Sequence, residues 1–304
     1  MTSTTPRFLL VTRIGPKSLH QNWIGTPKTR QFDVFLSAYT GDAEEVQQEG
    51  VRNELRPGFK VEGYGGFINA HRALWERYDY ICFWDEDLDT DTDTLNRMFA
   101  ICAEARFKIA QPALSHDSHF TYAGLLQQKG FRYRHINYIE MMCPIFRTDV
   151  LPAVETLYHS GYESGIDLIW CNLLFETPLD FAVIDDTPVR HTEAVGQRKE
   201  DNGFSTETRY EDHIHSLLNQ YDLPWLSCNP YSGICNSGRI VSSRMQLFLA
   251  ALGAFKSVTK QRPYWPRLRF VLVHLKHIAE ARPQNLKRNL SQPLAGPLPE
   301  CSET

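Results

Sequence analysis

Short apolar runs alternate with segments of helical periodicity over residues 7–195. The runs last only a few residues and are rich in Val, Ile, Phe and Tyr, a pattern typical of strands. We expect strands at 8–12, 32–37, 80–84, 107–110 and 181–184, and an extended stretch at 138–146. Helices are expected from Gly65 and Gly66 onward and at 94–105, 150–157 and 167–175. The alternation predicts an α/β fold with a mainly parallel central sheet.

The pattern changes in the carboxy-terminal part of the chain. From residue 239 it becomes two apolar-basic helical segments, separated by Pro263 and Pro266. We therefore divide the chain into a first domain, 1–235, and a basic helical appendage with a flexible tail, 236–304. Residues 239–304 hold eleven Lys or Arg against three acids, a net of +8, so the chain's total of −4 leaves −12 for residues 1–238. Such a basic amphipathic segment either lies on an anionic membrane surface or packs on the acidic first domain.

Composition and charge exclude several classes of protein. A chain of 304 residues with 42% hydrophobic residues is neither disordered nor collagen-like. A net charge of −4 argues against a dedicated nucleic-acid-binding protein. The chain has seven cysteines, an odd number, and no two of them form a Cys-x-x-Cys motif. Neither a disulfide framework nor a zinc site is therefore indicated. No apolar run is long enough for a signal-peptide core or a membrane span, and we expect a cytoplasmic protein, with the inner face of the membrane as a peripheral location.

The most informative stretch is the acidic segment Asp85-Glu86-Asp87, which directly follows the buried strand expected at 80–84. A strand that ends in carboxylates places them at the carboxyl edge of the sheet, where open α/β folds bind ligands. Two acids at i and i+2 point the same way while the backbone is extended, so both can reach one hard cation, Mg²⁺ or Mn²⁺. For Asp91 and Asp93, further along, we favour a role at the positive end of the following helix.

Three motifs carry a resemblance to a known family. Trp84-Asp-Glu-Asp-Leu88, Ala110-Gln-Pro-Ala-Leu114 and Glu140-Met-Met-Cys-Pro-Ile-Phe146 resemble, in order and spacing, the family catalogued as domain of unknown function 707. That family is grouped with the GT-A-fold glycosyltransferases, and the resemblance covers about residues 7–195. It implies a Rossmann-like GT-A fold with a nucleotide-sugar site and a divalent cation, Mn²⁺ or Mg²⁺, held by the Asp-x-Asp motif.

The resemblance also implies roles for residues outside that motif. Val189-Arg-His191 resembles the segment that supplies a third metal ligand, so the expected ligands are Asp85, Asp87 and His191. Gly165-Ile-Asp167 resembles a segment near the acceptor hydroxyl, which makes Asp167 the candidate catalytic base. Capping of a helix explains Asp167 equally well, and His191 can also be interpreted as an ordinary loop residue. In that case Asp185 or Asp186, otherwise turn formers, are the next ligands to test.

Further assignments follow from the place of each residue in a GT-A fold. The residues expected to bind the nucleotide are Arg13, Tyr39 and Glu86, and those expected to bind the sugar or acceptor are Trp84, Gln111 and Glu140. The alternatives are a solvated loop cation for Arg13, a core aromatic for Tyr39 and an ion pair with Arg147 for Glu140. The sequence Gly63-Tyr-Gly-Gly66 is interpreted as a turn that enters a helix.

The chemistry of glycosyl transfer matches these residue types. A divalent cation neutralises the leaving diphosphate, and a carboxylate near the acceptor hydroxyl takes its proton. We therefore predict a metal-dependent glycosyltransferase acting from a nucleotide-diphosphate sugar to a saccharide or lipid-linked acceptor. The alternatives are a metal-dependent phosphoester or nucleotide hydrolase, because clustered carboxylates also serve phosphoryl chemistry, and a non-catalytic carbohydrate-binding protein.

Overall fold

The computed structural model describes residues 7–194, 207–225 and 228–254, together with residues 268, 271, 272, 275 and 276. Its strands are β1 Phe8–Ile14, β2 Asp33–Ala38, β3 Val51–Leu55, β4 Tyr80–Trp84, β5 Leu88–Asp89, β6 Ile109–Leu114, β7 Phe131–Ile136, β8 Ile145–Arg147, β9 Phe181–His191, β10 Pro230–Cys235 and β11 Ile240–Val241. Its α-helices are α1 His20–Trp23, α2 Lys60–Ala70, α3 Arg72–Trp75, α4 Thr92–Ala105, α5 Leu151–Tyr158, α6 Asp167–Leu174, α8 Glu207–Gln220 and α9 Arg244–Ala251.

The strands form one central sheet in the order β11-β10-β7-β9-β6-β8-β4-β1-β2-β3, and β5 pairs with β9 beside this path. The four strands β4, β1, β2 and β3 are parallel, and so are β6 and β9. Strand β8 runs antiparallel to both β4 and β6, so β6 points the same way as β4. The expected Rossmann-like α/β fold with a sheet rich in parallel strands is confirmed, and the carboxyl ends of β1, β2, β4 and β6 meet at one edge.

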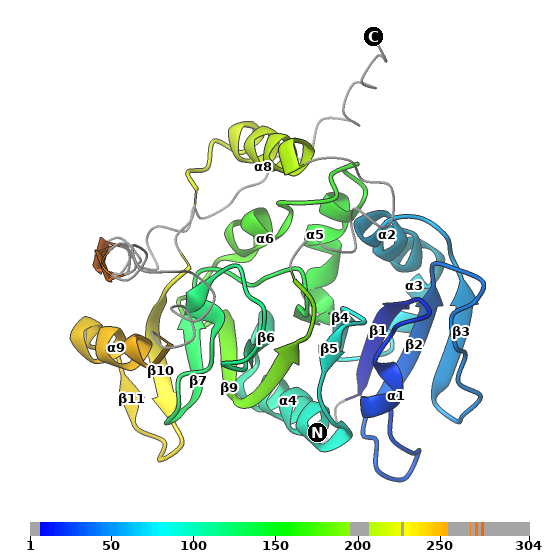
Figure 1. The fold of residues 1–304 in the computed structure, drawn as a ribbon, viewed down its shortest axis with the longest axis horizontal. Helices are drawn as coiled ribbons and strands as arrows, with labels where there is room; N and C mark the ends of the chain where they lie inside the picture. The colour runs from blue at the N-terminus through cyan, green and yellow to red at the C-terminus, as the bar shows by residue number, and fades with distance from the viewer. Residues whose placement is uncertain are drawn as a thin grey trace.

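A separate hydrophobic core covers each face of the sheet. Successive side chains of a strand point to opposite faces, so Leu9 and Val11 belong to the core with α2, α5 and α6, whereas Phe8 and Leu10 belong to the core with α4. Figure 1 shows α2, α5 and α6 on one side of the sheet and α4 on the other. Strand β4 is buried along its whole length, as its continuous apolar sequence predicts.

Helix α2 begins earlier than the sequence predicts, at Lys60, so the expected entry turn at Gly63-Tyr-Gly-Gly66 is wrong. These glycines lie inside the helix because neighbouring groups approach it closely. A Cβ on Gly63 would lie 2.2 Å from the Cζ atom of Arg13, and one on Gly65 would lie 2.5 Å from the carbonyl oxygen of Tyr158. The glycines therefore provide space for packing, at the usual entropic cost of glycine in a helix.

Two other expectations change. Strand β6 continues through Pro112 to Leu114, and its register with β9 shifts just after the proline, which is where a sheet tolerates a residue without an N–H. In the stretch 138–146 only the end is strand, because β8 begins at Ile145. Strands β3, β7, β10 and β11 and helix α8 were not expected from the pattern.

The carboxy-terminal part lies only partly within the described residues. Strands β10 and β11 pair with each other across the proposed boundary at residue 235, and Leu247 of α9 packs with Phe131 and Val241. The appendage beyond residue 254 falls almost wholly outside the described residues, and its division from the first domain stays a prediction. In the described part of the chain, no helix has the length and apolar character needed to cross a bilayer.

Candidate active site

The pairing of β5 with β9 brings Asp87 and His191 together. Leu88 of β5 lies opposite His191, and the backbone N–H of Thr192 donates to the carbonyl oxygen of Asp87. As a result His191 Nε2 lies 3.1 Å from Asp87 Oδ2, although the two residues are 104 positions apart. Burial by itself would lower the pKa of His191, but the hydrogen bond and negative charge of Asp87 outweigh it and raise the pKa. Two of the three expected metal ligands are therefore adjacent.

The geometry of this pair fits one side of a cation site. His191 Nδ1 donates to the carbonyl oxygen of His119 at 3.0 Å, which leaves Nε2 facing Asp87. Metal-binding histidines commonly have their second ring nitrogen fixed in this way. Asp85 is oriented differently, and among the described residues no three His, Cys, Asp or Glu side chains converge on one point.

Lys60 explains why Asp85 stands apart from this pair. The ammonium group of Lys60, at the start of α2, lies 2.6 Å from Asp85 Oδ1 and 2.7 Å from Oδ2. Burial raises the pKa of Asp85, and Lys60 opposes that rise. Lys60 was not predicted as a site residue, because a lysine at a helix start carries no local signal. Both oxygens of Asp85 are therefore engaged by Lys60 in this structure.

The residues expected to bind the nucleotide are held at the ends of β1 and β2. The carboxylate of Glu86, which is 8% exposed, accepts hydrogen bonds from the N–H of Gly15 at 2.6 Å and the hydroxyl of Tyr39 at 2.7 Å. Arg13 lies within β1 and is buried, not in a loop, and its guanidinium donates to the carbonyl oxygen of Gly58 at 2.7 Å. These contacts fix the half-buried ring of Tyr39 against Gly15, and binding of a nucleotide there stays a prediction.

Trp84 is a core residue in this structure. Its side chain is 0% exposed, and its indole ring packs edge-on against Trp23 with ring centroids 6.3 Å apart. Its carbonyl oxygen accepts the hydroxyl of Tyr64 at 2.9 Å. The structure thus corrects the expectation that the ring of Trp84 faces a sugar, because the alternating face of β4 turns that ring into the core with α4.

The other residues assigned to the sugar and acceptor gather around the segment that joins β7 to β8. Gln111, wholly buried in β6, accepts the N–H of Glu140 through Oε1 at 2.6 Å. Asp167, the first residue of α6, accepts the hydroxyl of Tyr138 at 2.6 Å and the N–H of Met141 at 3.2 Å. Burial raises the pKa of Asp167, and the bond from Tyr138 opposes that rise. Asp167 is therefore hydrogen-bonded to residues 138 and 141 of the segment that carries Glu140.

Several alternatives from the sequence are now decided. Asp91 caps α4 through a 2.7 Å bond from Thr94 N–H, so its helix-terminus role is confirmed. Arg147 pairs with Asp149, not Glu140. Asp185 is wholly buried in an ion pair with Arg134, so it is not the alternative metal ligand.

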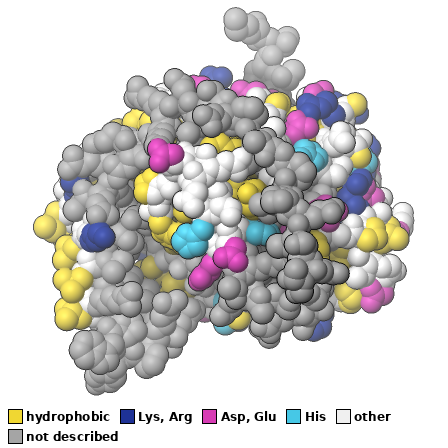
Figure 2. Space-filling model, turned by 90° about the horizontal axis from the view of Figure 1, so that it is seen from above, with side chains coloured by type: hydrophobic (Ala, Val, Ile, Leu, Met, Phe, Trp, Pro, Cys, Tyr) yellow, Lys and Arg dark blue, Asp and Glu magenta, His cyan; other side chains and the backbone are white. Residues whose placement is uncertain are grey.

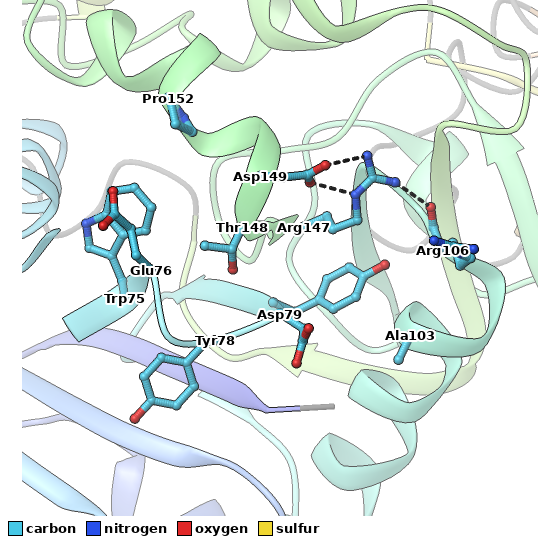
Figure 3. Close-up of a pocket in the computed structure, with 11 residues that line it drawn as sticks. Trp75, Glu76, Tyr78, Asp79, Ala103, Arg106, Arg147, Thr148, Asp149 and Pro152 are labelled. Atoms are coloured by element: carbon cyan, nitrogen blue, oxygen red, sulfur yellow. Dashed lines mark hydrogen bonds and ion pairs between the residues drawn. The ribbon is translucent and has the colours of Figure 1, made fainter. Parts of the chain in front are cut away.

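Figure 2 shows histidine and acidic side chains meeting at the surface on the face it draws. A hollow lies at the opposite edge of the sheet from the acidic segment, where β4 begins and β8 ends. It has a volume of about 630 Å³ and includes Tyr80, Arg147 and Thr148 in its lining. Figure 3 shows that the guanidinium of Arg147 donates two hydrogen bonds to the carboxylate of Asp149 and one to the carbonyl oxygen of Arg106. Arg147 and Asp149 of this hollow thus pair with each other, and Asp85, Glu86 and Asp87 do not line it.

Solved structures similar to this chain include forms of S. aureus TarS. The structure of TarS 1–349 in complex with UDP-GlcNAc is 11% identical over 70% of this chain and 67% of that chain, with a TM-score of 0.45. The complex of TarS 1–349 with UDP is 11% identical over 71% of each chain, with a TM-score of 0.38. No curated protein matches the sequence.

A family model matches residues 67–140, from within α2 to Glu140. The matched segment contains Asp85, Asp87, Gln111 and Glu140, whereas Asp167 and His191 lie beyond it. The match covers the motifs at 84–88 and 110–114 and ends at Glu140, the first residue of the third motif, so the resemblance is confirmed over this segment for the first two motifs. Residues 67–140 are thus similar to the family described as protein of unknown function (DUF707).

Proposed function

We propose that this protein is a glycosyltransferase that moves a sugar from a nucleotide-diphosphate sugar to a saccharide or lipid-linked acceptor. The observation that carries the proposal is the position of Asp85-Glu86-Asp87 directly after buried β4, at the edge where the parallel strands end. Ligands of open α/β folds bind at this edge. The pairing of β5 with β9 adds His191, and the segment before β8 adds Glu140 and its partner Asp167.

Asp87 and His191 are the residues proposed to hold a divalent cation, with Asp85 joining them when Lys60 releases it. A bound Mn²⁺ or Mg²⁺ ion would supply Lewis acidity toward the leaving diphosphate. Glu86 and Tyr39 are proposed to shape the nucleotide side, because they are linked to each other at the ends of β1 and β2. Lys60 is paired with Asp85, and its ammonium group is proposed to meet a diphosphate when the ion pair opens.

The test is release of nucleoside diphosphate from a panel of UDP- and GDP-sugars with Mn²⁺, comparing wild type with Asp87→Ala. We expect release by the wild type with at least one donor and a loss of about 10²-fold or more in Asp87→Ala, since the change removes a charge from the cation's immediate surroundings. Asp186→Ala is the matched control, because Asp186 is exposed on β9. Turnover that is unchanged by Asp87→Ala would contradict the proposed mechanism. Release of nucleoside monophosphate or free phosphate would favour the hydrolase.

We also propose that the carboxy-terminal segment touches an anionic membrane, which would bring the enzyme to a lipid-linked acceptor. Residues 239–304 carry a net +8. Leu268, Leu272 and Leu275 are helical and exposed by 65%, 56% and 45%. A spacing of four and then three residues puts them on one helix face. Apolar side chains on one face of a basic segment are typical of a helix that lies in the membrane interface.

A further inference from the structure

The carboxylate of Glu140 has a buried oxygen with no hydrogen-bond partner. Glu140 is 9% exposed, and its Oε2 atom contacts no donor within the described part of the chain. The backbone of the residue is nonetheless fixed, because its N–H donates to Gln111 Oε1 at 2.6 Å. A buried acceptor without a partner costs stability unless something else supplies the missing contact. A substrate hydroxyl is the group that the proposed reaction would bring there.

Asp167 differs from Glu140 in how its carboxylate is used. Asp167 Oδ2 accepts hydrogen bonds from the hydroxyl of Tyr138 and the N–H of Met141, on either side of Glu140 in the sequence. Asp167 therefore already has protein donors, unlike Glu140 Oε2, and both donors belong to the segment that carries Glu140. The contacts of Asp167 therefore hold that segment in place, with Gln111 holding it from the other side.

The charged groups that act on Glu140 come from four elements. They are Asp167 at the start of α6, His191 at the end of β9, Lys60 at the start of α2 and Asp85 after β4. Burial and the negative charge of Asp167 raise the pKa of Glu140 to about 7, while His191 and Lys60 oppose that rise. A carboxylate in this range is a stronger proton acceptor than an ordinary glutamate at neutral pH.

We propose that Glu140 is the catalytic base that takes the proton of the acceptor hydroxyl, and that Asp167 and Gln111 are positioning residues for it. The inference rests on the proposed glycosyl transfer. The acceptor oxygen forms its bond to the anomeric carbon as the bond from that carbon to the diphosphate oxygen breaks. The bonding electron pair leaves on the nucleoside diphosphate, and the acceptor proton moves to Glu140. Because the displacement is direct, the anomeric configuration is inverted.

The experiment uses the full chain, Mn²⁺ and the donor that the wild type accepts, with methanol as the acceptor. Methanol gives a methyl glycoside, whose anomeric configuration is stable and can be assigned by NMR. We expect the wild type to give the inverted product. We expect Glu140→Gln to lower kcat about 10²- to 10⁴-fold with little change in the KM for the donor, and to abolish the rise in rate near pH 7.

Asp167→Asn and Glu140→Ala separate a catalytic role from a positioning one. Asp167→Asn should also lower the rate but keep a rise with pH, because Glu140 is still present; the rise should move below pH 7, since the negative charge that helps to raise the pKa of Glu140 is gone. Sodium formate, a small replacement carboxylate, should restore part of the rate to Glu140→Ala and none to Asp167→Asn. Thermal unfolding of each variant checks that the fold is retained.

Two results would overturn the inference while leaving the glycosyltransferase in place. One is a Glu140→Gln variant that keeps the wild-type rate or its pH dependence. The other is a methyl glycoside with retained configuration. A wild type that releases no nucleoside diphosphate from any donor of the panel would instead overturn the proposed function, and the role of Glu140 with it.

Discussion

Removing one partner of the buried ion pair between Arg134 and Asp185 should strongly destabilise the fold. Both side chains are 0% exposed. The guanidinium donates two hydrogen bonds to the carboxylate, from Nε to Oδ2 at 2.7 Å and from Nη2 to Oδ1 at 2.9 Å. Arg134 also donates to the carbonyl oxygens of Gly124 and Leu126. Two unit charges about 4 Å apart attract by roughly 4 kcal/mol at an effective dielectric constant of about 20. Removing one partner of a buried pair typically costs about 3–5 kcal/mol, because the other charge is left uncompensated.

We therefore expect Asp185→Asn to lower the free energy of unfolding by about 3–5 kcal/mol. The matched control is Glu104→Gln, which makes the same carboxylate-to-amide change in the pair with Arg132, two residues before Arg134 on β7. That pair is solvent-exposed, with side-chain exposures of 63% and 34%, so the control should cost about 0–1 kcal/mol. Urea titration followed by circular dichroism measures both without changing the ionic strength.

The double variant Arg134→Met with Asp185→Leu tests the same reasoning from the other direction. Removing both charges leaves no uncompensated ion in the interior, so the double variant should be much more stable than the sum of the two single changes implies. The reasoning is refuted if Asp185→Asn costs no more than Glu104→Gln, or if the two single costs simply add.

Three further outcomes are expected. Lys60→Met should raise the affinity for Mn²⁺, because it removes the ammonium group that pairs with Asp85. Electron paramagnetic resonance of the free ion measures this affinity, and Lys129→Met, at an exposed site, should leave it unchanged. Binding by Lys60→Met that equals or falls below that of the wild type would contradict the competition between Lys60 and the cation. Leu272→Glu should reduce co-sedimentation with anionic liposomes, whereas Leu179→Glu, at a similarly exposed site (60%), should not, and equal effects would rule out the carboxy-terminal contact. The pKa of Glu140 is about 7, against an ordinary 4.5, so its protonated form stabilises the fold below pH 4.5 and this contribution is lost as the pH rises through 7. Glu140→Gln should flatten that part of a plot of unfolding free energy against pH. An unchanged slope would show that another group causes it.

Much of the fold could be predicted because the signals are local. Strand β4 has the predicted bounds, since five consecutive apolar residues followed by acids define both a buried strand and its end. Helix α4 begins at Thr92, two residues before the predicted start, and ends at the predicted residue, Ala105. Strand β3 escaped prediction because its residues are only half-buried or exposed, so its sequence carries little of the apolar pattern that marks the central strands.

The candidate site was less predictable than the fold. The nucleotide-side and sugar-side residues were chosen by their order after strands, which cannot separate a side chain that faces the site from one that faces the core. Trp84 is an example, because one step along β4 turns a side chain to the opposite face. Lys60 and the orphaned oxygen of Glu140 have no sequence signal at all, since each is defined by what surrounds it.

By itself, the sequence determined the α/β class, the buried β4 and the acidic segment that follows it, because these depend on residues adjacent in the chain. Only the tertiary structure decided which groups meet that segment. His191 reaches Asp87 through the pairing of β5 with β9, Lys60 reaches Asp85 from the start of α2, and Asp167 binds the segment that carries Glu140. These contacts depend on the order and register of strands distant in sequence, which local patterns of polarity do not encode.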